Sequence, residues 1–397
     1  MDLDDSRTIG QRLRRIRKAR GKSLVVVAGL AGMSKSQLDR IERGEVALDR
    51  ISQVVALANA LQIAPGDLLR LPVPAPANGH TDSATDEVRL ALIAVSRHRP
   101  GGQVVPVGVL RARVNAVQTA LHDCRQAELA SMLPGLIRDM HTSLAAGREV
   151  AELLDLAVLL HAQGVSHWLR IAGASVDLRR DNDVTLAYQL AERRDTPTAL
   201  GLVASRANKV LLDSGAFDLA MAELAAVEVP TTTPDALQLA GALALSQART
   251  AATAGEWADA EAALEHAAEL AARTGEGTAY GLGFGPTNVV LWRMEALLEA
   301  GDHELVTALA HELNPDVHPY LSRQSSYWRD YGRALARVKG RHHDAVIALR
   351  RAERIHPHRV QRDPFAREVL AELLTRAPRG TLGRELRGMA YRAGLPM

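Results

Sequence analysis

The chain has 397 residues, of which 47% are hydrophobic, and this length allows two or three domains with sizeable cores. Its single cysteine, Cys124, excludes an intramolecular disulfide, its acidic N-terminal stretch lacks the apolar segment of a secretion signal, and no apolar run is long enough to span a bilayer. The net charge is only +2, but residues 1–72 hold 13 Lys and Arg against 8 Asp and Glu, whereas the rest holds 35 against 38. We therefore expect a soluble, cytoplasmic protein without membrane contact, whose N-terminal part is attracted to nucleic acid.

The N-terminal part has the pattern of five short helices. Residues 9–23 carry apolar side chains at helical spacing with arginines around them, and residues 23–31, SLVVVAGLA, begin with a serine suited to cap a helix. Residues 32–44, GMSKSQLDRIERG, start with an S-x-x-Q capping box, place Leu38 and Ile41 on one face, and end at a glycine. Residues 50–69 add a fourth helix and a short fifth one that starts near Pro65.

Residues 9–69 resemble the phage-repressor (XRE) family of helix-turn-helix domains. The run A-x-x-x-G-M-S-x-x-x-L-x-x-I-E-R-G carries the resemblance, at Ala28, Gly32, Met33, Ser34, Leu38, Ile41, Glu42, Arg43 and Gly44. It implies that the helix over 35–42 enters the DNA major groove and that Arg17 pairs with Glu42 for architecture. The DNA-binding residues that follow from it are Ser23, Ser34, Lys35, Ser36, Gln37, Arg40 and Arg43.

The roles implied within this set differ. Lys35, Ser36 and Arg40 would read bases with support from Gln37, whereas Ser23 and Arg43 would contact phosphates. The β-branched run Val25–Val27 departs from the family, which usually has polar helix formers there. The alternative interpretation is a small helical domain with a solvated basic face, and the agreement of spacing, caps and turn glycine favours DNA binding.

The sequence pattern of the remaining chain predicts a linker followed by a helical repeat array. The segment 71–86, LPVPAPANGHTDSATD, lacks periodicity, so we expect domains at 1–72 and 87–397 with a linker at 73–86. Glycines at 215, 255, 301, 340 and 380 recur every 39 to 46 residues between amphipathic segments, which is typical of stacked helical hairpins. The pattern resembles the tetratricopeptide repeat, which implies an all-α fold with a right-handed α-solenoid and a concave inner surface.

The fusion of a helix-turn-helix domain to such an array resembles the bacterial regulators whose repeat domain receives a peptide pheromone. It is also similar to a set of actinomycete regulators. Counting back equal distances from each repeat glycine gives columns of residues that would face the concave surface. The candidate effector-binding residues from these columns are Arg206, Lys209, Arg249, Asn288, Trp292 and Tyr327. The alternative for such aromatic residues is the core between repeats, and for Arg329, Arg333 and Arg337 it is a solvated stripe.

Sequence motifs for catalysis or metal binding are missing. The chain has no nucleophile elbow, P-loop or metal-ligand spacing, and we interpret its 14 histidines as surface residues, so we expect no enzyme, no metal and no cofactor. The leading hypothesis is a homodimeric, nucleoid-associated transcriptional regulator that binds an inverted-repeat operator in double-stranded DNA, with its affinity modulated by a peptide or small-molecule effector. The alternative is a DNA-tethered adaptor whose repeat domain docks a protein partner without a small effector.

Overall fold

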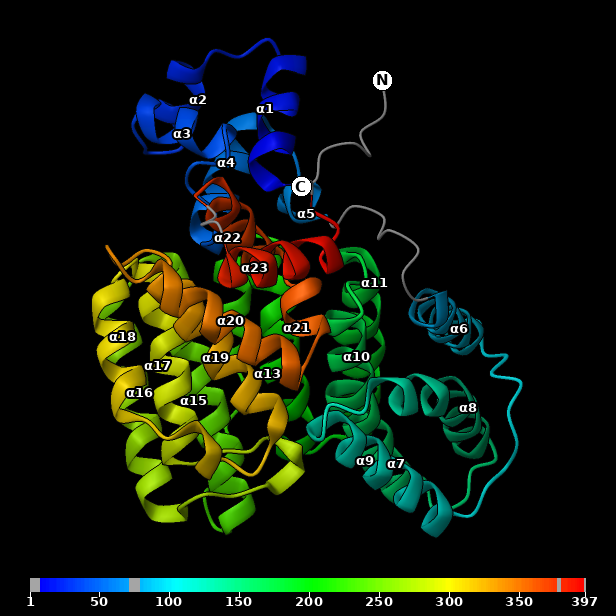
Figure 1. Cartoon of the computed structure of the whole chain (residues 1–397). Helices are drawn as coiled ribbons and strands as arrows, with labels where there is room; N and C mark the ends of the chain where they lie inside the picture. Colours follow the sequence, from blue (N-terminus) through cyan, green and yellow to red (C-terminus); the bar gives the residue numbers. More distant parts are fainter. Residues whose placement is uncertain (1–7, 71–78, 377–379, 396–397) are drawn as a thin grey trace.

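A computed structural model of the chain describes residues 8–70, 79–376 and 380–395. This described part is all-α and contains no strand. A small helical domain lies at one end of a larger array of paired helices (Figure 1).

The small domain consists of five helices that pack around one apolar core. They are α1 (Ile9–Ala19), α2 (Leu24–Leu30), α3 (Lys35–Glu42), α4 (Ile51–Leu61) and α5 (Pro65–Leu69). Leu13, Val27, Leu38 and Leu57 are fully buried in this core. The five helices expected from the sequence are thus confirmed, and α2 and α3 form the helix-turn-helix pair.

The segment expected to be a linker is partly helical. Helix α6 runs from Gly79 to Ser96, so residues 79–86 of the expected linker at 73–86 belong to a helix, and residues 71–78 lie outside the described part of the chain. A regular apolar pattern begins only beyond residue 86, which explains why the first turns of α6 escaped prediction.

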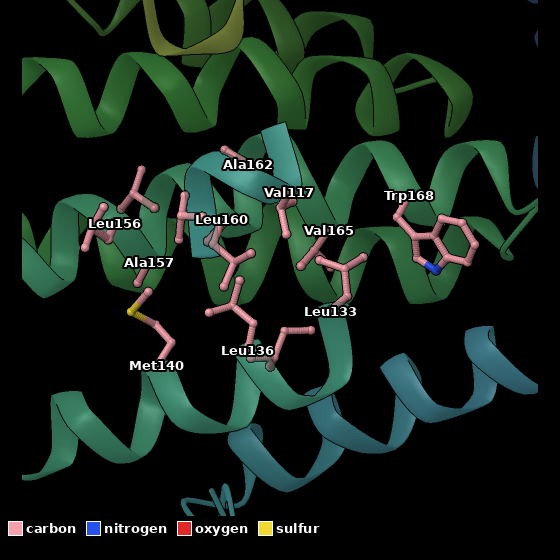
Figure 2. Close-up of a cluster of buried hydrophobic side chains, with 14 of the residues drawn as sticks. Val117, Leu133, Leu136, Met140, Leu156, Ala157, Leu160, Ala162, Val165 and Trp168 are labelled. Atoms are coloured by element: carbon pink, nitrogen blue, oxygen red, sulfur yellow. The ribbon is translucent and has the colours of Figure 1, made fainter. Parts of the chain in front are cut away.

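The next helices form a second core. They are α7 (Val107–His122), α8 (Gln126–Ala145), α9 (Val150–Leu159), α10 (Ser166–Ile171), α11 (Val176–Arg180) and α12 (Ala187–Arg194). Two π-helical turns, at Leu160–Val165 and Asp181–Leu186, continue α9 into α10 and α11 into α12. Figure 2 shows the buried cluster that joins these helices, with Leu133, Met140, Leu160 and Trp168 pointing into it.

Helical hairpins make up the rest of the array. The pairs are α13 (Pro197–Asp213) with α14 (Phe217–Ala225), α15 (Pro234–Ala254) with α16 (Trp257–Thr274), α17 (Pro286–Ala300) with α18 (His303–Glu312), and α19 (Leu321–Leu335) with α20 (His342–Ile355). Gly215, Gly255, Gly301 and Gly340 all have φ between 77° and 87°, the left-handed region that favours glycine at a turn. The glycine spacing therefore predicted the hairpins correctly.

The C-terminal helices connect the array to the small domain. They are α21 (His358–Gln361), α22 (Pro364–Thr375) and α23 (Thr381–Arg392), and short 3₁₀ turns lie at Ala279–Gly281 and Pro315–Val317. Phe365 at the start of α22 packs against the core of the small domain, and Ala47 of the small domain packs into the C-terminal core. A Cβ atom at Gly215 would lie 3.0 Å from Val55, so the turn of the first hairpin also abuts the small domain. No helix in the described ranges is long and apolar enough to cross a membrane.

Candidate functional site

The helix-turn-helix pair has the local contacts that its sequence predicts. Ser34 Oγ accepts a hydrogen bond from the Gln37 backbone N–H at 3.1 Å, which fixes the first turn of α3. The Arg17 guanidinium meets the Glu42 carboxylate through both Nε and Nη2, at 2.6 and 2.7 Å, and this bond raises the pKa of Arg17. The expected architectural pair is therefore confirmed, and it fastens the end of α3 to α1.

The predicted DNA-binding side chains lie on the outside of this unit. Ser23, Ser34, Lys35, Ser36, Arg40 and Arg43 are exposed and Gln37 is half-buried, whereas Leu38, Ile41 and Glu42 of the same helix are buried. Val25 and Val26 are 61% and 50% exposed on α2, so the β-branched run adds an apolar patch beside these polar residues. Helices α2 and α3 lie at the end of the small domain remote from the array, which leaves this face open (Figure 1).

Two of the candidate DNA-binding arginines, Arg40 and Arg43, form ion pairs with carboxylates of the same domain. Glu45 contacts Arg43 Nη1 at 2.8 Å and Arg40 Nε at 3.8 Å, and Asp39 contacts Arg43 Nη2 at 3.0 Å. All four side chains are more than 40% exposed, so these pairs are weak and can exchange for a phosphate or a base edge.

Three glutamates of the array accept hydrogen bonds from backbone N–H groups of the small domain, two of them in the first turns of its helices and one in a loop. Glu299 of α17 accepts from Ile51 N at 2.9 Å and from Ser52 N at 3.3 Å, in the first turn of α4. Glu368 of α22 accepts from Ile9 N at 2.6 Å, at the first residue of α1, and Glu372 accepts from Ala47 N at 2.9 Å. Because a helix N-terminus carries unpaired N–H donors and partial positive charge, Glu299 and Glu368 act as caps of α4 and α1 that the array supplies, whereas Glu372 holds the loop before α4 at Ala47.

Arginines of α19 complete this attachment. Arg337 contacts Asp49 at 3.2 Å and Glu372 at 2.5 Å, and Arg333 donates to the Asp49 backbone oxygen at 2.8 Å. Although burial alone would raise it, the pKa of Asp49 is lowered by the charges of Arg337 and Arg333. The interpretation of Arg329, Arg333 and Arg337 as a solvated stripe is therefore wrong, because the docked small domain covers Arg333 and Arg337, and Arg329 is buried in ion pairs with Asp330 and Glu295 of the array.

A cavity of about 750 Å³ lies between the small domain and the array. Helix α5 and Ile51 of α4 contribute one wall, and the other walls come from α10, α11, the first helices of the hairpins, α21 and α22. A smaller extension of about 60 Å³ shares Arg170, Arg179, Lys209, Arg249, Glu295 and Arg359 with it. A molecule that fills the main cavity would contact both the array and the helix-turn-helix domain, whereas the extension is lined by the array alone.

Four of the six candidate effector-binding residues line this space. Lys209 and Arg249 face both parts of the cavity, and Arg206 and Trp292 face the extension. Burial and the charge of Arg249 lower the pKa of Lys209 to about 7. The columns that contain Arg206, Lys209, Arg249 and Trp292 therefore face this space in the first three hairpins.

The other two candidates lie in the core and do not line the cavity. Tyr327 is 3% exposed, packs in the core of the last two hairpins, and donates from its hydroxyl to the Ala310 backbone oxygen at 2.6 Å. Its helix ends at Leu335, five residues before Gly340, whereas α15 and α17 end directly before their glycines, so counting from Gly340 selects another face. Asn288 is 2% exposed, within the first turn of α17.

Sequence reasoning missed several cavity residues. Arg170 and Arg359 lie on α10 and α21, outside the repeat pattern, so no glycine marks their register. Burial and the charge of Arg329 lower the pKa of Arg359 to about 10, and burial and the charge of Arg359 lower that of Arg170 well below its usual value. In both cases burial is the largest cause, and the charge of Glu295 opposes the shift only in part.

The assignment of the histidines to the surface is wrong for several of them. His161 and His356 are fully buried and His122 nearly so, and burial lowers the pKa of all three. His161 hydrogen-bonds Asn182 at 2.8 Å and His141 at 2.9 Å between the two π-helical turns. Within the described residues, no cluster of His, Cys, Asp or Glu could hold a metal ion.

Comparison with known families places a helix-turn-helix domain at residues 8–71. This match covers the five-helix domain described above and identifies it as a DNA-binding domain of the kind that the sequence resembles. No curated protein and no solved structure matches the chain in the corresponding searches.

Proposed function

We propose that the chain is a sequence-specific transcriptional regulator whose helical array binds an effector and thereby controls the helix-turn-helix domain. One observation carries this proposal. The DNA-reading helix α3 is exposed, while α4 and α5 of the same domain are held by the array and form a wall of the cavity. A ligand in the cavity would contact the domain that binds DNA without covering the face that reads it.

The DNA-binding part of the proposal follows from the face that α2 and α3 present. Lys35, Ser36 and Arg40 extend from the exposed side of α3, whose width suits a major groove, and Ser23 and Arg43 flank it for phosphate contacts. One such module reads few base pairs, so a homodimer on an inverted repeat supplies the specificity that a genome requires. We propose non-enzymatic regulation at the nucleoid, with residues 1–72 reading DNA and residues 87–397 sensing the effector.

The array resembles tetratricopeptide hairpins in its turn glycines and in the small residues Ala220, Ala260 and Ala345, which are buried early in the second helix of three hairpins; α18 has Val306 at this position. This resemblance supports an interaction role for its inner surface. The volume of about 750 Å³ suits a small-molecule effector, since ligand pockets span roughly 300–1,000 Å³.

A selection from genomic DNA tests the DNA-binding part. Purified full-length protein is incubated with fragmented DNA of its own genome, and the retained fragments are sequenced. The matched control is a variant with Lys35, Arg40 and Arg43 replaced by alanine, since these three side chains are exposed and leave the core intact. Enrichment of a shared inverted repeat by the wild type alone supports the proposal, and equal retention by both proteins contradicts it.

A fractionated cell extract tests the effector part. DNA affinity for the selected site is measured with the small-molecule filtrate of the extract and, separately, with the protein fraction retained by the filter. A shift caused by the filtrate supports control by an effector. A shift that requires the protein fraction would instead identify an adaptor that docks a protein partner.

A further inference from the structure

The extension of the cavity concentrates positive charge. Of its fifteen lining residues, seven are Arg or Lys and one, Glu295, is a carboxylate. The seven cations come from six helices and are Arg170, Arg179, Arg206, Lys209, Arg249, Arg323 and Arg359, with Arg206 and Lys209 both on α13. The array beyond residue 72 is slightly acidic as a whole, so this accumulation is local to the cavity.

Part of this charge is balanced within the protein. Arg179 contacts Asp213 at 2.8 Å, and Arg249 contacts Glu295 at 3.3 Å. Glu295 also contacts Arg329 at 3.4 Å, so one carboxylate is divided between two guanidinium groups. The charges of Arg249 and Arg329 lower the pKa of Glu295 although burial acts in the opposite direction, which keeps this carboxylate ionised.

Arg170 and Arg359 remain without a carboxylate partner among the described residues and share a neutral histidine. Arg170 Nη2 lies 3.4 Å from His167 Nδ1, and Arg359 Nη2 lies 3.4 Å from His167 Nε2. A neutral imidazole has one acceptor nitrogen and one N–H, and a guanidinium only donates, so at most one of these contacts can be a hydrogen bond. Burial and the neighbouring Arg170 lower the pKa of His167 and keep it neutral. The site therefore presents hydrogen-bond donors that lack an acceptor.

Buried donors and cations without acceptors are unfavourable, and proteins keep them where a ligand supplies the missing charge. The Nε atom of Arg359 is buried without any hydrogen-bond partner. Lys209 is half-buried beside it, and the charges of Asp213 and Glu295 offset those of Arg249 and Arg170 only in part. Carboxylate and phosphate oxygens match these donors, because they accept bidentate bonds from arginine. Trp292 beside the cations offers an apolar surface for the carbon skeleton of a ligand.

We infer that this cavity binds a small polyanion, a molecule that carries two or more carboxylate or phosphate groups, between Arg170, Lys209 and Arg359. The inference deepens the proposed function, because it names the chemical class of the effector. The polyanion accepts hydrogen bonds from the guanidinium groups that His167 cannot satisfy together. Uncharged molecules and monovalent anions leave most of the donors unpaired and bind weakly.

The test is calorimetric titration of the full-length protein with citrate and with pyrophosphate at constant ionic strength. Sucrose serves as an uncharged molecule and chloride as a monovalent anion. The basic face of α3 could also attract polyanions, so the variant with Lys35, Arg40 and Arg43 replaced by alanine is titrated in parallel. We expect saturable binding of at least one of the two polyanions by both proteins. Preference for citrate or for pyrophosphate then distinguishes a carboxylate effector from a phosphate one.

Substitutions in the cavity make the assignment specific. Arg359→Gln and Lys209→Gln should each weaken polyanion binding by about 10-fold or more, as expected for loss of one charge-assisted hydrogen bond. Arg354→Gln removes an exposed cation of α20 and should leave the affinity unchanged. Arg359→Gln should also raise the melting temperature of the ligand-free protein, since it removes a buried cation that lacks a counter-charge. A merely structural arginine would have the opposite effect on the melting temperature.

The outcomes separate this inference from the proposed function. Absence of saturable binding by citrate and pyrophosphate overturns the inference, as does equal binding by Arg359→Gln and Arg354→Gln. Polyanion binding without DNA selection overturns the regulatory proposal and leaves the site standing. Selection of an inverted repeat without polyanion binding overturns the polyanion site and leaves the regulatory proposal standing.

Discussion

Replacement of Glu299 by alanine should release the first turn of α4 and loosen the helix-turn-helix domain from the array. Glu299 accepts from the backbone N–H groups of Ile51 and Ser52 and from Ser52 Oγ, at 2.9, 3.3 and 3.2 Å. Arg50 at the N-cap position of α4 makes no side-chain cap of its own. The glutamate of another domain is therefore the cap of this helix.

The size of the effect follows from these contacts. Loss of a helix cap costs about 0.5–2 kcal/mol, and a hydrogen bond to a charged group contributes about 1.5–3 kcal/mol. Because Glu299 is half-buried and its contacts are not independent, we expect a total of about 2–3 kcal/mol. This corresponds to a shift of roughly 30- to 150-fold between the docked and released arrangements. Glu299→Gln keeps one acceptor oxygen and should lose about half as much free energy.

Hydrogen exchange of the full-length protein measures this effect directly. Backbone amides in the first turn of a helix have no acceptor within the helix, so protection of Ile51 and Ser52 comes from Glu299. The matched control is Glu265→Ala, which removes an exposed glutamate from the outer helix α16. Faster exchange at Ile51 and Ser52 in Glu299→Ala, with no change in Glu265→Ala, is the expected result. If both variants exchange like the wild type, the assignment of Glu299 as the cap and anchor of α4 is refuted.

Four further outcomes are expected. Burial raises the pKa of Glu368 to about 7, so the folded protein favours the protonated side chain. The stability that this preference contributes is complete below the ordinary pKa of a glutamate and is lost as the pH rises through 7. The melting temperature of Glu368→Gln should therefore vary less between pH 5 and 8 than that of the wild type. Arg40→Ala should cost about 1–3 kcal/mol on the cognate site and relax specificity, whereas Arg43→Ala should weaken binding to all DNA and lower the salt slope by about one, as measured by fluorescence anisotropy at several salt concentrations. Glu45→Gln should strengthen DNA binding, because its carboxylate holds Arg43 and Arg40 and repels phosphate, and an unchanged affinity would show that these ion pairs do not compete with DNA. Lys209 with a pKa of about 7 should take up a proton when a polyanion binds, so citrate affinity should fall between pH 7 and 9 in the wild type but stay constant in Lys209→Met; the groups that act on Lys209 are Arg249, Asp213, Arg170 and Glu295.

The sequence predicted those features that depend on neighbouring residues. A serine cap, an apolar face and a turn glycine define α3 within thirteen residues. The Arg17–Glu42 pair was expected from the family resemblance and not from local sequence. The hairpins were predictable because each turn requires a left-handed residue, and Gly255 and Gly301 supply it directly after α15 and α17.

The docking of the two domains could not be predicted in the same way. Glu299 and Glu368 bond to residues 248 and 359 positions away, and nothing in their local sequence distinguishes them from solvated glutamates. The same holds for Arg333 and Arg337, whose regular spacing is typical of an exposed stripe until the small domain covers it. The predicted inner face of α19 was wrong for a local reason, because α19 ends at Leu335 and Gly340 lies at the end of a longer turn.

The position of the cavity determines how a ligand could act on DNA binding. A ligand shifts an equilibrium only if it binds one arrangement better than the other. Residues of α5 and Ile51 of α4 line the cavity, so contacts to them exist only while the helix-turn-helix domain is docked. A polyanion should therefore favour the docked arrangement and slow amide exchange in α4. By linkage, DNA that selects the docked arrangement must raise polyanion affinity by the same factor by which the polyanion raises DNA affinity.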